Sequence, residues 1–236
     1  MFTYLLINLL SVSIPFAFSF HKRLNFYKTW YAFWPAVLIT AAVFIAWDVL
    51  YTHWGIWGFN PQYLTGIYLL NLPLEEWLFF ICIPYASVFT YASLNELIKK
   101  DIFAKIAAPL SWVLILGLFL IGLLNLGRLY TGVTFIASAV FLLANITVFK
   151  SKFLGRFYLA YIAVFAGPFL IVNGILTGSF IDGTVVWYNN SENLFFRVFT
   201  IPVEDFIYGF FLLLMNITLY EYFMSRKAEA DAVKNG

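Results

Sequence analysis

The chain has 236 residues, of which 63% are hydrophobic and 11% charged, whereas about 25% of residues are charged in an average soluble domain. This composition excludes a soluble globular protein, because too few polar groups are present to cover a surface that faces water. The formal net charge of +2 gives no indication of nucleic-acid binding. The single cysteine, Cys82, excludes an intrachain disulfide and argues against a cysteine-based metal site.

Apolar segments of roughly 20 residues, the length needed to cross a bilayer, follow one another along the chain. The first has neither a positively charged start nor a small-residue cleavage site, so we interpret it as a retained helix rather than a signal peptide. The polar tail, residues 225–236, is expected to fray. The sequence therefore predicts an all-α membrane protein with seven transmembrane helices, at residues 2–20, 30–52, 73–95, 106–126, 129–149, 157–178 and 202–224.

The basic residues predict the orientation of these helices in a cell membrane. Of the 14 lysines and arginines, only Arg128 and Arg197 fall on one side; the rest lie in three loops and the tail, on the other. Loops rich in lysine and arginine remain in the cytoplasm. We therefore expect the C-terminus to be cytoplasmic and the N-terminus to lie outside.

The two halves of the chain resemble each other at a shift of 129 residues. Phe59-Asn60 corresponds to Tyr188-Asn189, and Pro73-Leu-Glu-Glu76 corresponds to Pro202-Val-Glu-Asp205. Repeats of this kind are common in membrane proteins. We predict two parallel three-helix repeats joined by helix 4, so that the chain divides into 1–95, 96–128, 129–224 and the cytoplasmic tail 225–236.

Two acidic pairs, Glu75-Glu76 and Glu204-Asp205, are the strongest candidates for catalysis. A proline followed by acids at a helix start has a purely structural explanation, since acids there complement the helix dipole. However, the arrangement occurs twice, and carboxylates near a membrane interior are costly. Successive helical residues point about 100° apart. We therefore expect Glu75 and Glu204 to face the bundle centre, with Glu76 and Asp205 supporting them or facing water.

Asp48 and Asn173 are two further polar candidates in the predicted second and sixth helices. Asp48-Val-Leu-Tyr-Thr52 resembles Asn173-Gly-Ile-Leu-Thr177, although this match needs a four-residue gap relative to the main shift. We expect both to join the acidic pairs at one cavity in the outer half of the bundle. The alternative is that they only form hydrogen bonds between helices.

Many aromatic residues surround these acids in the sequence. Aromatic faces can stabilise a carbocation, and a carboxylic acid in apolar surroundings keeps its proton more readily and can donate it. Together these features favour acid-initiated chemistry on an apolar polyene, whereas an aromatic belt at the membrane surface is the alternative. The expected substrate contacts are Trp47, Trp77, Phe80, Tyr85, Phe206 and Tyr208.

The duplicated motif resembles a known family. Pro73-Leu-Glu-Glu-Trp-Leu-Phe-Phe80 and Pro202-Val-Glu-Asp-Phe-Ile-Tyr208 are similar to the Pro-x-Glu-Glu/Asp signature of membrane-integral lycopene cyclases. That family includes two-subunit bacterial enzymes, their fused forms and the cyclase domain of fungal bifunctional enzymes. Because the resemblance covers both repeats, the chain resembles a fused form.

This resemblance implies a lycopene β-cyclase, an intramolecular lyase or isomerase of carotenoid biosynthesis. Its substrates would be lycopene and γ-carotene within membrane lipids, and each ψ-end would become a β-ionone ring without net redox change. The resemblance assigns the proton donor to Glu75 or Glu204. Relatives that cyclise C50 carotenoids share the motif, so both substrate lengths stay open. No G-x-G-x-x-G follows a strand, so we expect no flavin, and we expect no other cofactor or metal.

Three other functions were weighed. A retinal protein needs a lysine within the seventh helix, and residues 202–224 contain none. A small transporter of three-plus-one-plus-three design would use broken helices, for which Gly167 and Pro168 are candidates. A structural subunit of a larger complex is the third alternative.

Overall fold

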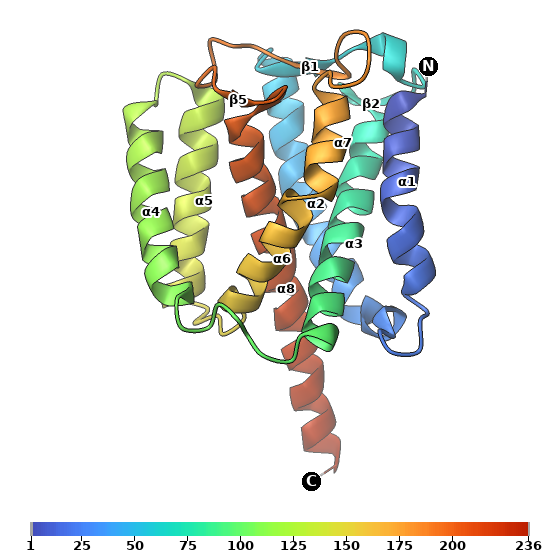
Figure 1. Cartoon of the computed structure of the whole chain (residues 1–236), viewed down its shortest axis with the longest axis vertical. Coiled ribbons are helices and arrows are strands. Elements are labelled where there is room, and N and C mark those ends of the chain that lie inside the picture. The colour runs from blue at the N-terminus through green and yellow to red at the C-terminus, as the bar shows by residue number, and fades with distance from the viewer. Residues whose placement is uncertain (1, 236) are drawn as a thin grey trace.

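The computed structural model describes residues 2–235, which form eight α-helices with short strands and 3-10 turns between them (Figure 1). Three of the strands connect α2 to α3, and three connect α7 to α8. The helices are α1 (Thr3–Phe18), α2 (Trp30–His53), α3 (Leu74–Leu97), α4 (Ala107–Leu124), α5 (Leu129–Thr147), α6 (Leu154–Phe165), α7 (Pro168–Leu176) and α8 (Val203–Asn235).

The expectation of a membrane protein built mainly from helices is confirmed in that the chain is mostly helical, with little sheet and several helices that could cross a membrane. Within the described residues, five helices are long and apolar enough to cross a membrane: α2, α3, α4, α5 and α8. Helices α6 and α7 together pass the same test as one span bent by 50°. Helix α1 is apolar but has 16 residues, fewer than the roughly 20 that a straight span needs.

The predicted sixth helix, residues 157–178, is not continuous. It begins earlier, at Leu154, and breaks between Phe165 and Pro168. Proline has no backbone N–H and its ring crowds the preceding turn, so Pro168 starts a new helix instead of continuing the old one. Figure 1 shows the change of direction between α6 and α7, and residues of both helices line the cavity described below.

The tail also differs from the expectation. Helix α8 continues past residue 224 to Asn235 and projects from the bundle (Figure 1). Alanine, glutamate, lysine and arginine, which dominate this segment, have high helix propensity. An exposed ion pair between Arg226 and Glu229, one turn apart at 3.4 Å, lies on its surface.

Helices from one half of the chain pack against helices from the other half. Helix α1 packs on α3 as α5 packs on α8, while α2 contacts α8 and α6 contacts α3. The start of α1 and the end of α8 lie at opposite ends of the bundle (Figure 1). This reciprocal packing brings α3 and α8, which carry the two acidic motifs, together at the centre.

The short strands join the halves at the end of the bundle where α1 begins. Strand β1 (Trp57–Phe59) pairs antiparallel with β4 (Val186–Tyr188), and Gly58 lies opposite Trp187. A Cβ atom at Gly58 would collide with the Trp187 indole ring, so a larger residue here would displace that side chain.

Two more hairpins lead into the helices that carry the acids. Strands β2 (Tyr68–Leu69) and β3 (Leu72–Pro73) precede α3, and β5 (Arg197–Val198) and β6 (Ile201–Pro202) precede α8. Strands of two or three residues are too short to give an alternating sequence pattern, which is why none was predicted.

Candidate active site

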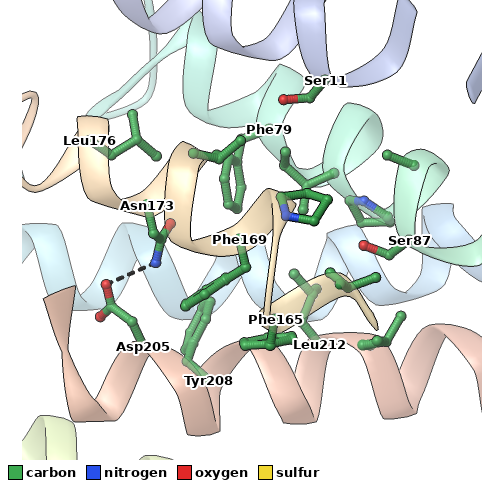
Figure 2. A pocket seen from close by; sticks show the side chains of 18 of the residues that line it. Ser11, Phe79, Ser87, Phe165, Phe169, Asn173, Leu176, Asp205, Tyr208 and Leu212 are labelled. Atoms are coloured by element: carbon green, nitrogen blue, oxygen red, sulfur yellow. Dashed lines mark hydrogen bonds between the residues drawn. The ribbon is translucent and has the colours of Figure 1, made fainter. Parts of the chain in front are cut away.

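A cavity of about 680 Å³ lies between α1, α3, α8 and the bent pair α6–α7 (Figure 2). Asp48, Glu76 and Asp205 line its outer end, together with Asn173. Its lining extends along α3 from Glu76 to Thr90, which corresponds to about 21 Å at the rise of an α-helix. Between these ends the walls are mainly apolar, so the cavity suits an elongated apolar molecule.

Asp48 and Glu76 form the first carboxyl cluster. Both are buried, and their side chains are close enough to hydrogen bond to each other. The Tyr4 hydroxyl donates to Oε2 of Glu76 at 2.5 Å, and the Tyr208 hydroxyl donates to Oδ1 of Asp48 at 2.8 Å. Two carboxyl groups can form a hydrogen bond only when one of them carries a proton. A hydrogen bond between Asp48 and Glu76 would therefore require a proton on one of the two acids.

Asp205 forms the second cluster, which contains a single carboxyl group. Tyr130 donates to Oδ1 at 2.6 Å, while Tyr188 and Asn173 donate to Oδ2 at 2.9 Å and 3.1 Å. Figure 2 shows the last of these bonds reaching from α7 to α8. Three donors to one carboxyl favour its ionised form. Burial of Asp205 opposes that form, so the three donors offset part of the cost of a buried charge.

Tyr188, in β4, is one of these donors and lies outside the membrane-spanning helices. Burial, followed by the neighbouring Asp205, raises the pKa of its phenol well above the usual value. The hydroxyl therefore keeps its proton and donates a hydrogen bond to Asp205.

The expected convergence of polar groups is present in this geometry. Asp48, Asn173, Glu76 and Asp205 all line one cavity, although they come from four helices. The proposed match between Asp48 and Asn173 also fits, because each side chain contacts the second acid of the motif in its own half.

The expected orientation of the acidic pairs is reversed. Glu76 and Asp205 line the cavity, whereas Glu75 and Glu204 do not. All four are buried, so neither Glu76 nor Asp205 faces water. The physical reason lies in the first turn of each helix, where side chains lean back towards the helix start and meet the preceding loop.

Glu75 and Glu204 hold the loops that precede α3 and α8. Oε1 of Glu75 accepts a bond from the Thr65 backbone N–H at 2.6 Å, and Oε1 of Glu204 accepts one from that of Leu194 at 2.7 Å. The Thr131 hydroxyl also donates to Glu204, at 2.6 Å. Both residues therefore hold in place the loop that precedes their own helix.

Of the six aromatic residues expected to contact substrate, only Tyr208 lines the cavity. Trp47 packs against Tyr208 with ring centroids 5.7 Å apart, one layer behind the wall. Phe206 packs on Phe169, at 4.8 Å, and so supports a residue that does line the cavity.

The other three lie further away. Trp77 donates to the Leu69 carbonyl in the β2–β3 hairpin at 3.3 Å. Phe80 is buried beside Phe44. Tyr85 lies in the core at the inner end of the bundle, where its hydroxyl shares a 2.6 Å hydrogen bond with that of Ser19.

Several residues that line the cavity were not predicted from the sequence. Tyr4 and Tyr130 each lie in the first turn of their helix and bind one carboxyl cluster. Phe165 and Phe169 flank the break between α6 and α7, with ring centroids 4.1 Å apart. Aromatic residues four positions apart on either side of a Gly-Pro pair are the signal that points to the second group.

No group of three or more His, Cys, Asp or Glu side chains is placed to hold a metal ion within residues 2–235. The sites of interest are therefore the two carboxyl clusters and the apolar cavity between α3 and α8.

Comparison with protein families gives a match that covers most of the chain. The model of the lycopene cyclase family matches residues 1–94 and 127–223. No match was found among curated proteins or among solved structures. The matched stretches include both acidic motifs and both carboxyl clusters, and they omit α4. The chain therefore belongs to the lycopene cyclase family.

Proposed function

We propose that the chain is a lycopene β-cyclase that converts the ψ-ends of lycopene to β-ionone rings, giving γ-carotene and then β-carotene. One observation carries this proposal beyond family membership. A pair of neighbouring carboxyl groups, Asp48 and Glu76, and a separate, triply hydrogen-bonded carboxyl, Asp205, lie at the same end of one apolar cavity. Such a site can give a proton to a polyene and take another one away.

The first step assigns the proton donor to the Asp48–Glu76 pair rather than to Glu75 or Glu204. The shared proton passes to C2 of the terminal isoprene unit, which leaves a cation at C1. The C5–C6 double bond then attacks C1 and closes the ring, leaving the positive charge at C5. Tyr4 and Tyr208 stabilise the carboxylate that remains, because each donates to one of the two acids.

The second step assigns the base to Asp205. Its carboxylate lies in the same cavity, attracts the cation and accepts the proton that C6 loses as the C5–C6 double bond forms. One proton enters and one leaves, so the product is an isomer of the substrate. The proton then returns to the Asp48–Glu76 pair before the next turnover.

Aromatic walls support the charged intermediate. Tyr208, Phe79 and Phe169 line the cavity near the acids (Figure 2). The electron-rich face of an aromatic ring attracts a cation. The same apolar walls keep out water, which would otherwise add to the cation and give an alcohol.

An opening between α1 and α7 gives the substrate access from the bilayer. Leu10, Ile14 and Ile171 line the cavity and yet are exposed over 69%, 67% and 62% of their surface. Residues that face both the cavity and the surrounding lipid mark a lateral entrance. A water-insoluble polyene can therefore reach the acids without leaving the membrane.

For the membrane, we propose seven passes, with α1 as a short span and α6–α7 as one broken span. The N-terminus then lies outside the cell membrane and the C-terminus in the cytoplasm, as the basic loops predict. We retain two three-helix repeats, 1–95 and 129–224, joined by 96–128. The register of β1 and β4 supports this arrangement, because Gly58 pairs with Trp187 and these residues are 129 positions apart.

Expression in a lycopene-accumulating bacterium, followed by chromatography of the pigments, tests the function. We expect β-carotene, with γ-carotene as the intermediate. Unchanged lycopene, with the protein present in the membrane, would contradict the proposal. A transporter, which the family match does not favour, would also leave the pigments unchanged.

A further inference from the structure

The turns of the two hairpins that precede α3 and α8 share an uncommon backbone conformation. The first turn, between β2 and β3, is Leu70-Asn71, and the second, between β5 and β6, is Phe199-Thr200 (Figure 1). Leu70 has a φ angle of 58° and Phe199 one of 57°, and the two residues are equivalent at the shift of 129. Both therefore adopt the left-handed conformation, which strains a bulky residue, at a turn position where glycine is usually found.

The two strained residues contact little of the protein itself. Leu70 is exposed over 77% of its surface and Phe199 over 82%. A bulky residue is retained in a strained conformation where its side chain has a function, and packing within the chain does not supply that function here. Because leucine and phenylalanine are apolar, the surface that these side chains contact must be apolar too.

The surroundings of both turns are also apolar. Residues 64–74 contain no charged side chain. In the second hairpin the charged residue is Arg197, which donates to the Thr200 carbonyl at 2.6 Å. Four large apolar side chains beside the turns each expose about half of their surface or more: Ile67, Leu69, Phe195 and Phe196. Exposed apolar patches of this kind mark sites of interaction with a membrane or with another protein.

The bilayer is the apolar phase that adjoins this end of the bundle. Helix α5 begins at the same end as α8, since Tyr130 in its first turn bonds to Asp205. Helix α4, which is long and apolar enough to cross a membrane, therefore ends there too. Leu124 and Leu126, at and just after its last residue, are exposed over 74% and 60% of their surface. The lipid-facing surface of the spanning helices thus continues to the level of the hairpins.

The backbone of the hairpins suits the boundary between lipid and water. The Ile67 carbonyl accepts from the backbone N–H of Leu74 at 2.8 Å. The equivalent bond joins the Phe196 carbonyl to the Val203 N–H at 3.0 Å. Unpaired backbone groups are costly in hydrocarbon, whereas water reaches them among the lipid headgroups. A short hairpin with part of its edge satisfied can therefore lie at headgroup level and direct its side chains towards the acyl chains.

We propose that the turns at Leu70 and Phe199 are paired membrane anchors, which place their side chains among the acyl chains of the leaflet at this end of the bundle. Each hairpin leads directly into the helix that carries one acidic motif, so each anchor holds the start of that helix at a fixed depth. This inference goes beyond the proposed function and needs only that the helices cross a membrane.

Fluorescence quenching tests the depth of the turns. Full-length protein with Cys82→Ala, which removes the one native cysteine, receives Leu70→Cys or Phe199→Cys and is labelled with bimane. The labelled protein is placed in phosphatidylcholine nanodiscs, where both faces are open to water. Ser191→Cys is the matched control, because Ser191 is an exposed polar residue in a loop at the same end of the bundle. Lipids with brominated acyl chains quench probes in the membrane, and iodide quenches probes in water.

We expect brominated lipid to quench the probes at positions 70 and 199 several-fold more than the control probe, and iodide to quench them several-fold less. Iodide quenching equal to that of the control would overturn the inference, because the turns would then face water. Weak quenching by both agents would also overturn it, since a protein surface, such as a second copy of the chain, would then cover the turns. If Phe199→Cys does not accumulate, Phe195→Cys carries the probe next to the same hairpin. Ring formation is not measured, so each of these results leaves the cyclase proposal intact.

Discussion

The two carboxyl clusters occupy equivalent places in the two halves, yet their hydrogen bonds differ. In the first half Glu76 contacts another acid, Asp48, whereas in the second half Asp205 contacts an amide, Asn173. One cluster therefore pairs two acids, and the other surrounds one acid with donors. Under the proposed mechanism, two similar halves thus supply an acid and a base, and the first difference between them is aspartate in one half and asparagine in the other.

The second difference concerns tyrosine. At the shift of 129 residues, Tyr188 corresponds to Phe59 and Tyr208 to Phe79. Both tyrosines come from the second half, but Tyr208 donates to Asp48 and Tyr188 donates to Asp205. The second half thus supplies one extra donor to each cluster. The second cluster takes all its donors from the second half, whereas the first cluster needs Tyr208 from the second half in addition to its own Tyr4.

The largest expected effect comes from the acid of the first cluster. Glu76→Gln removes the shared proton, because an amide cannot release one at neutral pH. We expect ring formation to fall by about 10²–10⁴-fold, the range that general acid catalysis contributes. The measurement is the initial rate of γ-carotene formation in membranes, normalised to the amount of protein.

Glu75→Gln is the matched control, since it makes the same change one residue away, outside the cavity lining. If Glu75→Gln were the inactive variant and Glu76→Gln active, the two acids would have the roles that the sequence alone predicted.

The second largest effect is expected from substitution of the base, Asp205. It distinguishes the two clusters by the products formed as well as by the rate. Asp205→Asn should lower β-ring formation by about 10²-fold. Because the cation at C5 still forms, the proton can be lost from C4 or from the C5 methyl group instead. We therefore expect products with ε- or γ-type rings, identified by chromatography and absorption spectra. Glu76→Gln should change the rate without changing the products; the same product mixture from both variants would refute the division into acid and base.

A smaller effect is expected from the tyrosines that distinguish the halves. Tyr188→Phe removes a bond to the Asp205 carboxylate, and a hydrogen bond to a charged group contributes about 1.5–3 kcal/mol. We expect kcat to fall by at least about tenfold, since about 1.4 kcal/mol is tenfold in rate. Tyr208→Phe should lower kcat less, because the Asp48–Glu76 pair retains its internal bond and the bond from Tyr4.

Phe59→Tyr makes the reverse change at the position in the first half that corresponds to Tyr188. It adds a hydroxyl group to the half that lacks one, and it should not restore the activity of Tyr188→Phe. Restoration by this second substitution would show that the two clusters are interchangeable.

Much of the scaffold could be predicted from the sequence, because long apolar segments and basic loops carry a strong signal. Helices α1, α2, α3, α4 and α5 begin and end within two residues of the predicted bounds. The acids were found because they are rare in apolar segments. Which acid of each pair faces the cavity was not predictable, since the lipid-facing side of these helices is as apolar as the side that faces the protein.

The partners of the acids were beyond the sequence for a different reason. Tyr4 binds Glu76 and Tyr208 binds Asp48 across large separations in the chain, so these bonds depend on the packing of whole helices. Trp77 and Phe80 were expected in the site because they are close to the motif in sequence. Trp77 points about 100° away from Glu76 around the helix. Phe80, four positions after Glu76, lies near the same side, but it packs against Phe44 instead of lining the cavity.

The smallest expected effects belong to the acids that anchor the loops. Glu75→Gln and Glu204→Gln keep an oxygen that can accept from the Thr65 and Leu194 backbone N–H groups, but the bond is no longer charge-assisted. We expect each to lower stability by about 1 kcal/mol, and to reduce activity by less than about tenfold. Glu204→Gln should be the more destabilising, because Thr131 donates to the same oxygen. Thermal denaturation of the purified protein measures this order, and a loss of activity without a loss of stability would place these glutamates in the chemistry after all.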